Sequence, residues 1–337
     1  MKKIALIGLC ASVLTLASCG GSSTSTSAIA AYLQTPVAAT YTDPDTLSAF
    51  NAINTFRNTM GLGYWSQNTL LDLAAANHMH YSTLNDPTYQ VDLEVAANQG
   101  FTGLQATDRA LSVGYGSITV PNVVGEFYST GTGTPTLTST GTATTTGATI
   151  IDGIVNTIYH RSGLLAQTTR EVGIAHNDLA LGSASAATHW WINHGRLDTG
   201  QYNASTFTMV YPISGQIGVP LHMDVELPQP FPDVSAAQTA TSLSSPISFS
   251  TAQGTTITVT TFTVTPSFST TPLSARLMTM TNDPNLYLAS HEAYLVANAP
   301  FLPNTTYNVS FTGTSYLPLY GITTALAQNW SFTTGSN

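Results

Sequence analysis

In four segments between residues 43 and 159 the apolar side chains recur every three or four positions, the period of helices with one buried face. The first helix is predicted to begin at Asp43, a capping residue followed by Pro44, and to end at Gly61. Three more helices are predicted: one from about Asn68, one over Thr107–Val113 and one over Ile150–Tyr159. This part of the chain is therefore expected to be rich in helices.

Beyond residue 170 the pattern changes to the alternation of strands. The segments EVGIA, THWWINH and TFTMVYP are typical of strands, so residues 43–215 should combine helices with a sheet. Four prolines then fall within residues 216–237, in an extended segment that suits neither a helix nor a central strand. Residues 238–337 contain short β-rich segments at the spacing of a β-sandwich. The predicted fold is α+β, with a proline-rich linker between a mixed domain and an all-β domain.

The first 18 residues have the layout of a secretory signal, with Lys2 and Lys3, an apolar run, and small residues before Cys19. The stretch LASC resembles the bacterial lipoprotein box, in which cleavage precedes an acylated cysteine. A plain signal peptide and an uncleaved membrane helix are the alternatives, but the apolar run is shorter than the roughly 20 residues of a membrane span. We expect residues 1–18 to be removed, Cys19 to anchor the protein in a membrane, and residues 19–42 to form a flexible tether.

Charge and cysteine content narrow the possible partners. Without its first 18 residues the chain has six arginines, no lysine and 17 acidic residues, a net charge of −11. Binding to a phosphate backbone needs clustered cations, so no nucleic-acid partner is expected. Cys10 is removed with the signal, so no disulfide is expected and the stability of the fold must come from packing.

Three residues are candidates for chemistry. Glu126 lies among apolar residues in VVGEFY, so it either faces solvent or is buried against a partner, because an unpaired buried carboxylate is costly. His160 ends the fourth predicted helix in YHRSG, where a cation in the last turn and Gly163 beyond it would close the helix. His78 lies on the apolar stripe of the second helix, a position more typical of a hydrogen-bonded core histidine than of a ligand.

Four motifs, in this order along the chain, resemble a known family. Residues 50–81, FNAINTFRNTMGLGYWSQNTLLDLAAANHMHY, are similar to the opening of the CAP superfamily (cysteine-rich secretory, antigen 5 and pathogenesis-related-1 proteins), in its bacterial extracytoplasmic branch. GFTGLQATDRALSVGY fits the same branch, and VGEFY resembles the family's Gly-Glu-Asn element. IYHRSGLLAQTTREVGIA resembles the family's segment from His-Arg to a glycine-containing strand. The resemblance covers about residues 43–215.

The resemblance implies an α-β-α sandwich with a cleft that usually holds two histidines and two glutamates. Glu126 and His160 match one of each, and where the other histidine is expected the segment VDLEV offers Asp92 and Glu94. Where the second glutamate is expected, the chain has an asparagine and a threonine. A divalent metal would therefore lack a complete ligand set, and no cofactor is expected. With His78, these four residues form the predicted ligand-binding site, and capping and cleft roles are compatible for His160.

The C-terminal segment LPNTTYNVSFTGTSYLPLYGITTALAQNWSFTT resembles the end of bacterial immunoglobulin-like domains, which mainly space or bind partners. The preferred hypothesis is a lipid-anchored, non-enzymatic envelope protein that binds a small molecule, lipid, glycan or peptide in the CAP cleft. One alternative is a hydrolase of peptidase or esterase type, in which His160 and Glu126 activate water. The other is a structural envelope protein. Gly20 lacks the acidic character associated with inner-membrane retention, so the expected location is the outer membrane.

Overall fold

The computed structural model describes residues 30–85, 92–117, 123–131, 147–180, 186–197 and 200–336. The predicted signal segment, Cys19 and the first part of the tether, up to residue 29, lie outside these ranges. Among the described residues, no helix has both the length and the apolar character needed to cross a membrane.

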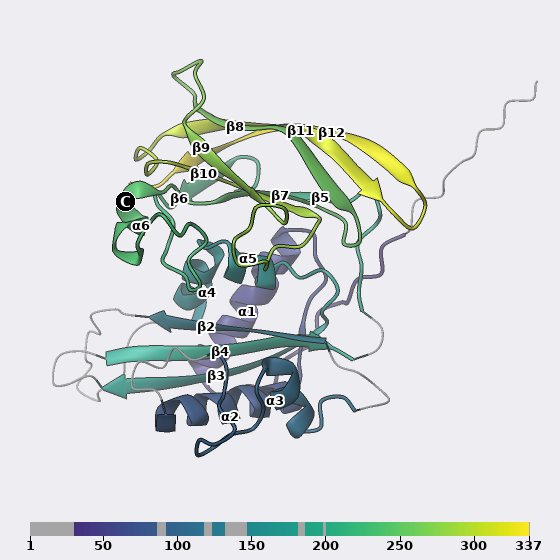
Figure 1. Ribbon diagram of the computed structural model, residues 1–337, viewed down its shortest axis with the longest axis vertical. Coiled ribbons are helices and arrows are strands. Elements are labelled where there is room, and N and C mark those ends of the chain that lie inside the picture. The colour runs from purple at the N-terminus through teal and green to yellow at the C-terminus, as the bar shows by residue number, and fades with distance from the viewer. Residues whose placement is uncertain are drawn as a thin grey trace, which may run out of the picture.

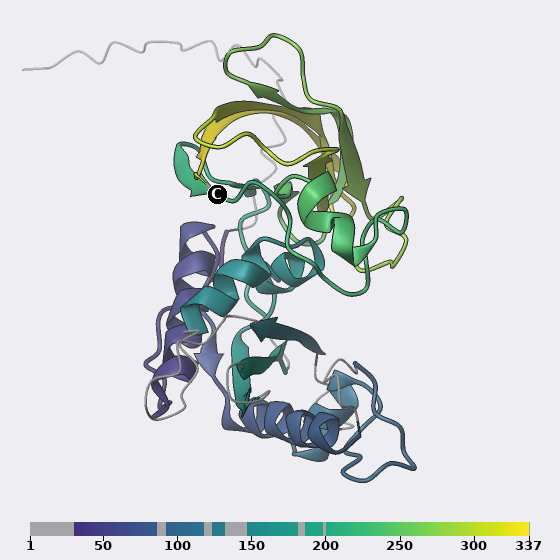
Figure 2. The same ribbon diagram turned by 90° about the vertical axis from the view of Figure 1, so that its left-hand side faces the viewer.

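The first half of the molecule is one sheet with helices on both faces (Figures 1 and 2). Its helices are α1 (Pro44–Thr59), α2 (Thr69–Asn85), α3 (Ala106–Ser112), α4 (Gly147–Val155) and α5 (Tyr159–Leu164). The strand order is β1-β3-β4-β2, formed by β1 (Ser66–Gln67), β3 (Glu171–Ala180), β4 (Ala186–Arg196) and β2 (Val123–Gly131). Strand β4 is antiparallel to both of its neighbours. Helices α2 and α3 cover one face, and α1 and α4 lie on the other.

The second half consists of two sheets around a common apolar core. One sheet contains β5 (Thr208–Tyr211), β7 (Ile247–Thr251), β10 (Glu292–Ala297) and β9 (Ala275–Thr279). The other contains β6 (Gln216–Val219), β12 (Ile322–Thr334), β11 (Thr306–Leu317) and β8 (Thr256–Pro266), and α6 (Ala236–Ser242) lies beside them. The rings of Phe249 and Phe311 stack across the core with centroids 3.8 Å apart. The second half lies on the side of the first half that carries α4 and α5 (Figure 1). Together the two halves confirm the predicted α+β class.

The boundary between the halves falls earlier than the sequence indicated. Strand β5, within the expected first domain, pairs with β7, and β6, within the expected linker, pairs with β12. Val210 packs in the core of the second half, while its neighbour Met209 packs with Met60 and Leu62 of the first half. One face of β5 is buried in the core of the first half and the other face in the core of the second. The alternating sequence pattern therefore does not indicate to which sheet the strand belongs.

The interpretation of His160 as the residue that closes a long helix is wrong. Helix α4 ends at Val155, and a second helix, α5, begins at Tyr159, so His160 lies in a first turn rather than in a last one. The buried carboxylate of Glu226 accepts hydrogen bonds from the amides of Ile158 (2.7 Å) and Tyr159 (2.9 Å). This distant residue supplies acceptors for the otherwise unsatisfied amides at the start of α5.

Helix α2 lies directly on the backbone of β3 at Gly173. A Cβ atom at this position would lie 2.1 Å from the amide nitrogen of Asp72 and 2.1 Å from the carbonyl carbon of Leu71. Both are backbone atoms of α2 and cannot turn aside as a side chain would. The glycine of EVGIA is therefore required by the close approach of helix and sheet.

We predict that Gly173→Ala lowers the free energy of unfolding by about 3 kcal/mol, because the helix must move off the sheet. Gly153→Ala in α4 is the matched control, since its Cβ would lie 3.8 Å from the nearest atom, an oxygen of Asp224. This control should leave stability unchanged or raise it by up to about 1 kcal/mol through helix propensity. Urea unfolding followed by circular dichroism measures both, and equal stability of the two variants would contradict the packing argument.

The two halves are joined through α5. Arg161 is fully buried, and its guanidinium donates to the carbonyl oxygen of Val155 in the first half and to that of Pro246 (2.8 Å) in the second. The guanidinium also lies over the ring of Tyr211, 4.4 Å from its centroid. Burial lowers the pKa of Arg161. On the next residue, the hydroxyl of Ser162 donates to the buried carboxylate of Glu292 (2.8 Å).

We predict that Arg161→Met destabilises the protein by about 3 kcal/mol, because it leaves two buried carbonyl oxygens without donors. It should also separate the unfolding of the two halves into distinct transitions. Arg276→Met is the control: Arg276 pairs with Asp233 at the surface, where an ion pair contributes little. Calorimetry that shows the same single transition for both variants would exclude Arg161 as the link between the halves.

Candidate functional site

The edge strand β2 carries a buried carboxylate that is paired with a guanidinium and an imidazole. Oε1 of Glu126 accepts from Nη2 of Arg109 (2.5 Å) and lies 2.7 Å from Nδ1 of His78. The side chains of His78 and Arg109 are 1% exposed and that of Glu126 is 9% exposed. Burial alone would raise the pKa of Glu126, but His78 and Arg109 more than offset this effect and hold it below its usual value. Glu126 is thus buried with partners, one of the two outcomes considered from the sequence.

The glycine before Glu126 determines which way the carboxylate points. A Cβ on Gly125 would lie 2.5 Å from Nε2 of His194 on the paired strand β4, so only glycine leaves room for that ring. His194 stacks on Trp65, with centroids 5.0 Å apart, and its burial lowers its pKa to about 3. Because side chains alternate along a strand, Glu126 then faces the opposite side, toward α2.

Arg109, in α3, was not singled out from the sequence. Besides its bond to Glu126, its Nη1 donates to the carbonyl oxygens of Asp92 and Leu104, at 3.2 Å each. It thereby fixes the segment between α2 and α3 against the sheet. In the sequence, Arg109 is an arginine in the short predicted helix TDRALS, one face of which must be buried. No sequence pattern indicated which residue it pairs with.

Asp92 links these buried groups to His160. Although Asp92 reaches solvent, the surrounding protein raises its pKa by desolvation, and the charge of Glu126 raises it further. His160, His78 and Arg109 act in the opposite direction, so all four groups lie within electrostatic reach of Asp92. Helix α5, which carries His160, packs against β2. We call His78, Asp92, Arg109, Glu126 and His160 the β2 cluster.

Glu94, the remaining predicted site residue, has a different role. Its buried carboxylate turns into its own loop, where it accepts from the amides of Thr102 (2.5 Å) and Gly103 (3.2 Å). Asn156, at the place expected for a second glutamate, donates to the carbonyl oxygen of His222 (2.8 Å) and accepts from Ser245 (2.6 Å). It therefore holds the chain that leads into the second half, and Glu94 holds the loop beside Asp92.

The carboxylate that contacts the ring of His160 is Glu226, from the predicted linker. Its Oε2 lies 3.2 Å from Nδ1 of His160, and its side chain is fully buried. In the sequence, Glu226 lies in the extended segment predicted as a linker, and no pattern there indicates a role for it. The contact depends on how the linker folds back over α5, which no local pattern encodes.

The β2 cluster does not fit a metal ion. In the part of the chain that the structure describes, no group of three histidines, cysteines or acidic residues is arranged to hold one. In the pair formed by His78 and Glu126, Oε1 of the carboxylate is already engaged by the guanidinium of Arg109. The charge of Glu126 is thus neutralised by protein groups.

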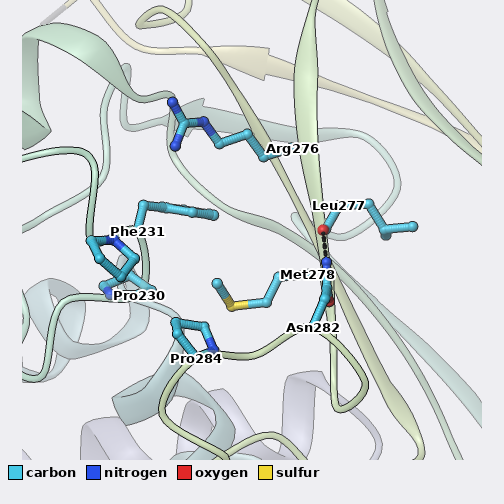
Figure 3. Close-up of a pocket in the computed structure, with 8 residues that line it drawn as sticks. Pro230, Phe231, Arg276, Leu277, Met278, Asn282 and Pro284 are labelled. Carbon is cyan, nitrogen blue, oxygen red and sulfur yellow. Dashed lines mark hydrogen bonds between the residues drawn. The ribbon is translucent and has the colours of Figure 1, made fainter.

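A separate hollow of about 270 Å³ lies in the second half (Figure 3). Its lining residues are Pro230, Phe231, Pro232, Arg276, Leu277, Met278, Asn282 and Pro284. Its one charged residue, Arg276, lies over the ring of Phe231, 5.2 Å from its centroid, and pairs with Asp233 (2.6 Å). None of the lining residues belongs to the β2 cluster, and they include no acid, base or nucleophile that could act with Arg276.

Comparison with known proteins gives little further information. No family model matches the sequence, and no curated protein matches it. One solved structure to which the fold is similar is an outer surface protein from Borrelia burgdorferi, at 13% sequence identity and a TM-score of 0.33. The alignment covers 47% of this chain and 96% of that chain.

We predict that Glu126→Gln costs about 3 kcal/mol of stability at neutral pH, because it leaves Arg109 buried without its counter-charge. In the unfolded chain Glu126 takes up a proton near its usual pKa of 4.5, while in the folded protein its pKa is lower. Its contribution is therefore present above pH 4.5 and is lost as the pH falls through the folded value. Urea unfolding of both proteins over this range should show the difference shrinking in acid. A difference that does not change with pH would contradict the pairing.

Proposed function

We propose that this protein is an extracytoplasmic protein of the CAP type, anchored to the outer membrane through Cys19, whose β2 cluster binds an envelope ligand. The α-β-α arrangement with a CAP cleft and the immunoglobulin-like character of the second half are parts of this proposal. The observation that carries it is the gathering of five ionisable groups from α2, α3, α5, β2 and the α2–α3 loop at one sheet edge. Ionisable groups collect in this way at binding sites more often than in ordinary cores.

The charges of the cluster favour one class of ligand. Its fixed cation, Arg109, is engaged by Glu126, while Asp92 reaches solvent with a raised pKa. An anionic group would therefore meet the repulsion of Asp92 without an uncommitted guanidinium to bind. A neutral or basic group would instead interact favourably with the side chains of Asp92 and His160. The proposed ligand is a lipid, glycan or peptide whose polar part is uncharged or positive.

The test is native mass spectrometry of the full chain with three probes: a zwitterionic phospholipid, a neutral peptidoglycan fragment and a short basic peptide. We predict that at least one binds, and that Asp92→Asn and His160→Ala each weaken its binding by about tenfold through loss of a charged hydrogen bond. His80→Ala is the matched control, because His80 lies exposed on α2. Binding of none of the probes, or equal loss in the control, would overturn the proposal and favour a structural envelope role.

Hydrolysis is the second candidate, on one observation. A carboxylate at Nδ1 of a histidine is the arrangement that orients a general base, and His160 has it in Glu226. Glu126, the partner first expected, is held by His78 and Arg109 instead. Under this alternative His160→Ala abolishes turnover in a peptide and ester library while the melting temperature stays nearly unchanged. Wild-type protein without turnover would exclude it.

A further inference from the structure

We infer that Glu226 is a positioning residue for His160, supplied to the β2 cluster by the second half of the molecule. The inference deepens the proposed function and rests on it only where a ligand is concerned. It starts from four contacts of one buried carboxylate. Oε1 accepts from the amide of Ile158 (2.7 Å), and Oε2 accepts from the amide of Tyr159 (2.9 Å). Oε2 also lies 3.2 Å from Nδ1 of His160 and 3.4 Å from its amide nitrogen.

The two short hydrogen bonds from backbone amides hold the carboxylate in place independently of its contact with the imidazole. Both of its oxygens are engaged, so it cannot rotate away from His160 without losing a backbone partner. A carboxylate accepts and cannot donate, so its position 3.2 Å from Nδ1 favours a proton on that ring nitrogen. In the neutral ring this makes Nδ1 the donor and leaves the lone pair on Nε2, at the opposite side of the ring. Glu226 thus favours the tautomer in which Nε2 carries the lone pair.

The segment that carries Glu226 is itself fixed to both halves. The amide of Asp224 donates to the carbonyl oxygen of Asn156 (3.2 Å), and the amide of Met223 donates to that of Leu243 (3.4 Å). Met223 packs in a core with Ile158 and Tyr294. The backbone at Glu226 is therefore held in a defined position relative to α5 by contacts with both halves. The second half, expected from the sequence to act as a spacer, becomes part of the site.

The test uses the full chain with ¹⁵N-labelled histidine and reads the tautomer of His160 from its ring nitrogen shifts. In Glu226→Gln, the single amide oxygen must satisfy the backbone amides, so the NH₂ group turns toward the ring and opposes a proton on Nδ1. We predict that the ratio of the Nδ1–H to the Nε2–H tautomer falls by roughly tenfold. The best matched control is Glu292→Gln, because Glu292 is equally buried and also contacts α5, but through Ser162. Glu292→Gln should leave the tautomer of His160 unchanged, whatever it does to the melting temperature.

An unchanged tautomer in folded Glu226→Gln, or the same change in Glu292→Gln, overturns the inference. If Glu226→Gln does not fold, Glu226→Asp keeps a charge beside the amides but withdraws it from the ring, and the same tautomer change is expected. For any probe found to bind, Glu226→Gln should weaken binding by about tenfold and Glu292→Gln should not. The tautomer measurement needs no ligand, so failure of the proposed ligand binding and failure of the positioning role are distinguishable.

Discussion

The contact between the two halves of the molecule, and the position of His160 in the β2 cluster, depend on two buried charged residues that bind the backbone at helix α5. Glu226 binds the amides at its start, and Arg161, one turn on, binds carbonyl oxygens of both halves. A buried charge without partners costs several kcal/mol, so each of these residues is stable only when the other elements are in place. The halves therefore cannot separate at little cost, and the position of His160 is a property of the whole chain.

Local rules account for the parts that the sequence predicted. The start of α1 was predicted because Asp43 caps the amide of Thr46 at 2.7 Å, an interaction within four residues. The strand character of β3 and β4 follows from their alternation. Gly125 in β2 and Gly173 in β3, by contrast, are explained by close contacts with His194 and with helix α2, which lie far along the chain. Of the site, Glu126 and His160 were identified because their motifs resemble a family. That both belong to one cleft was implied by the resemblance and not by their spacing in the sequence.

What the sequence did not reveal depends on partners far along the chain. The run Ile150–Tyr159 has apolar residues at helical spacing up to its end, but the helix breaks after Val155, and the start of α5 is stabilised by Glu226, some 70 residues away. Arg109 could not be distinguished in the sequence from an exposed helix arginine. Its acceptors are Glu126 and two loop carbonyl oxygens, and only the folded chain brings these to it. Glu94 differs, because the amides that it binds, those of Thr102 and Gly103, are only eight and nine residues away. They lie in an irregular loop, and no periodic pattern indicates that the carboxylate binds them rather than a ligand. Long-range electrostatics, unlike capping, leaves no periodic trace in a sequence.

The β2 cluster divides into a fixed part and a responsive part, which bears on what it can do. Glu126 is neutralised by His78 and Arg109, so it neither moves nor exchanges protons near neutral pH. Asp92 has a raised pKa, which means that its charged form is disfavoured by folding, and the native state loses stability as the pH rises through the unfolded value. A positive group placed beside Asp92 would reverse that loss by lowering its pKa. Such a site gains most from a basic group, so the polar part of the proposed ligand is uncharged or positive overall and not anionic.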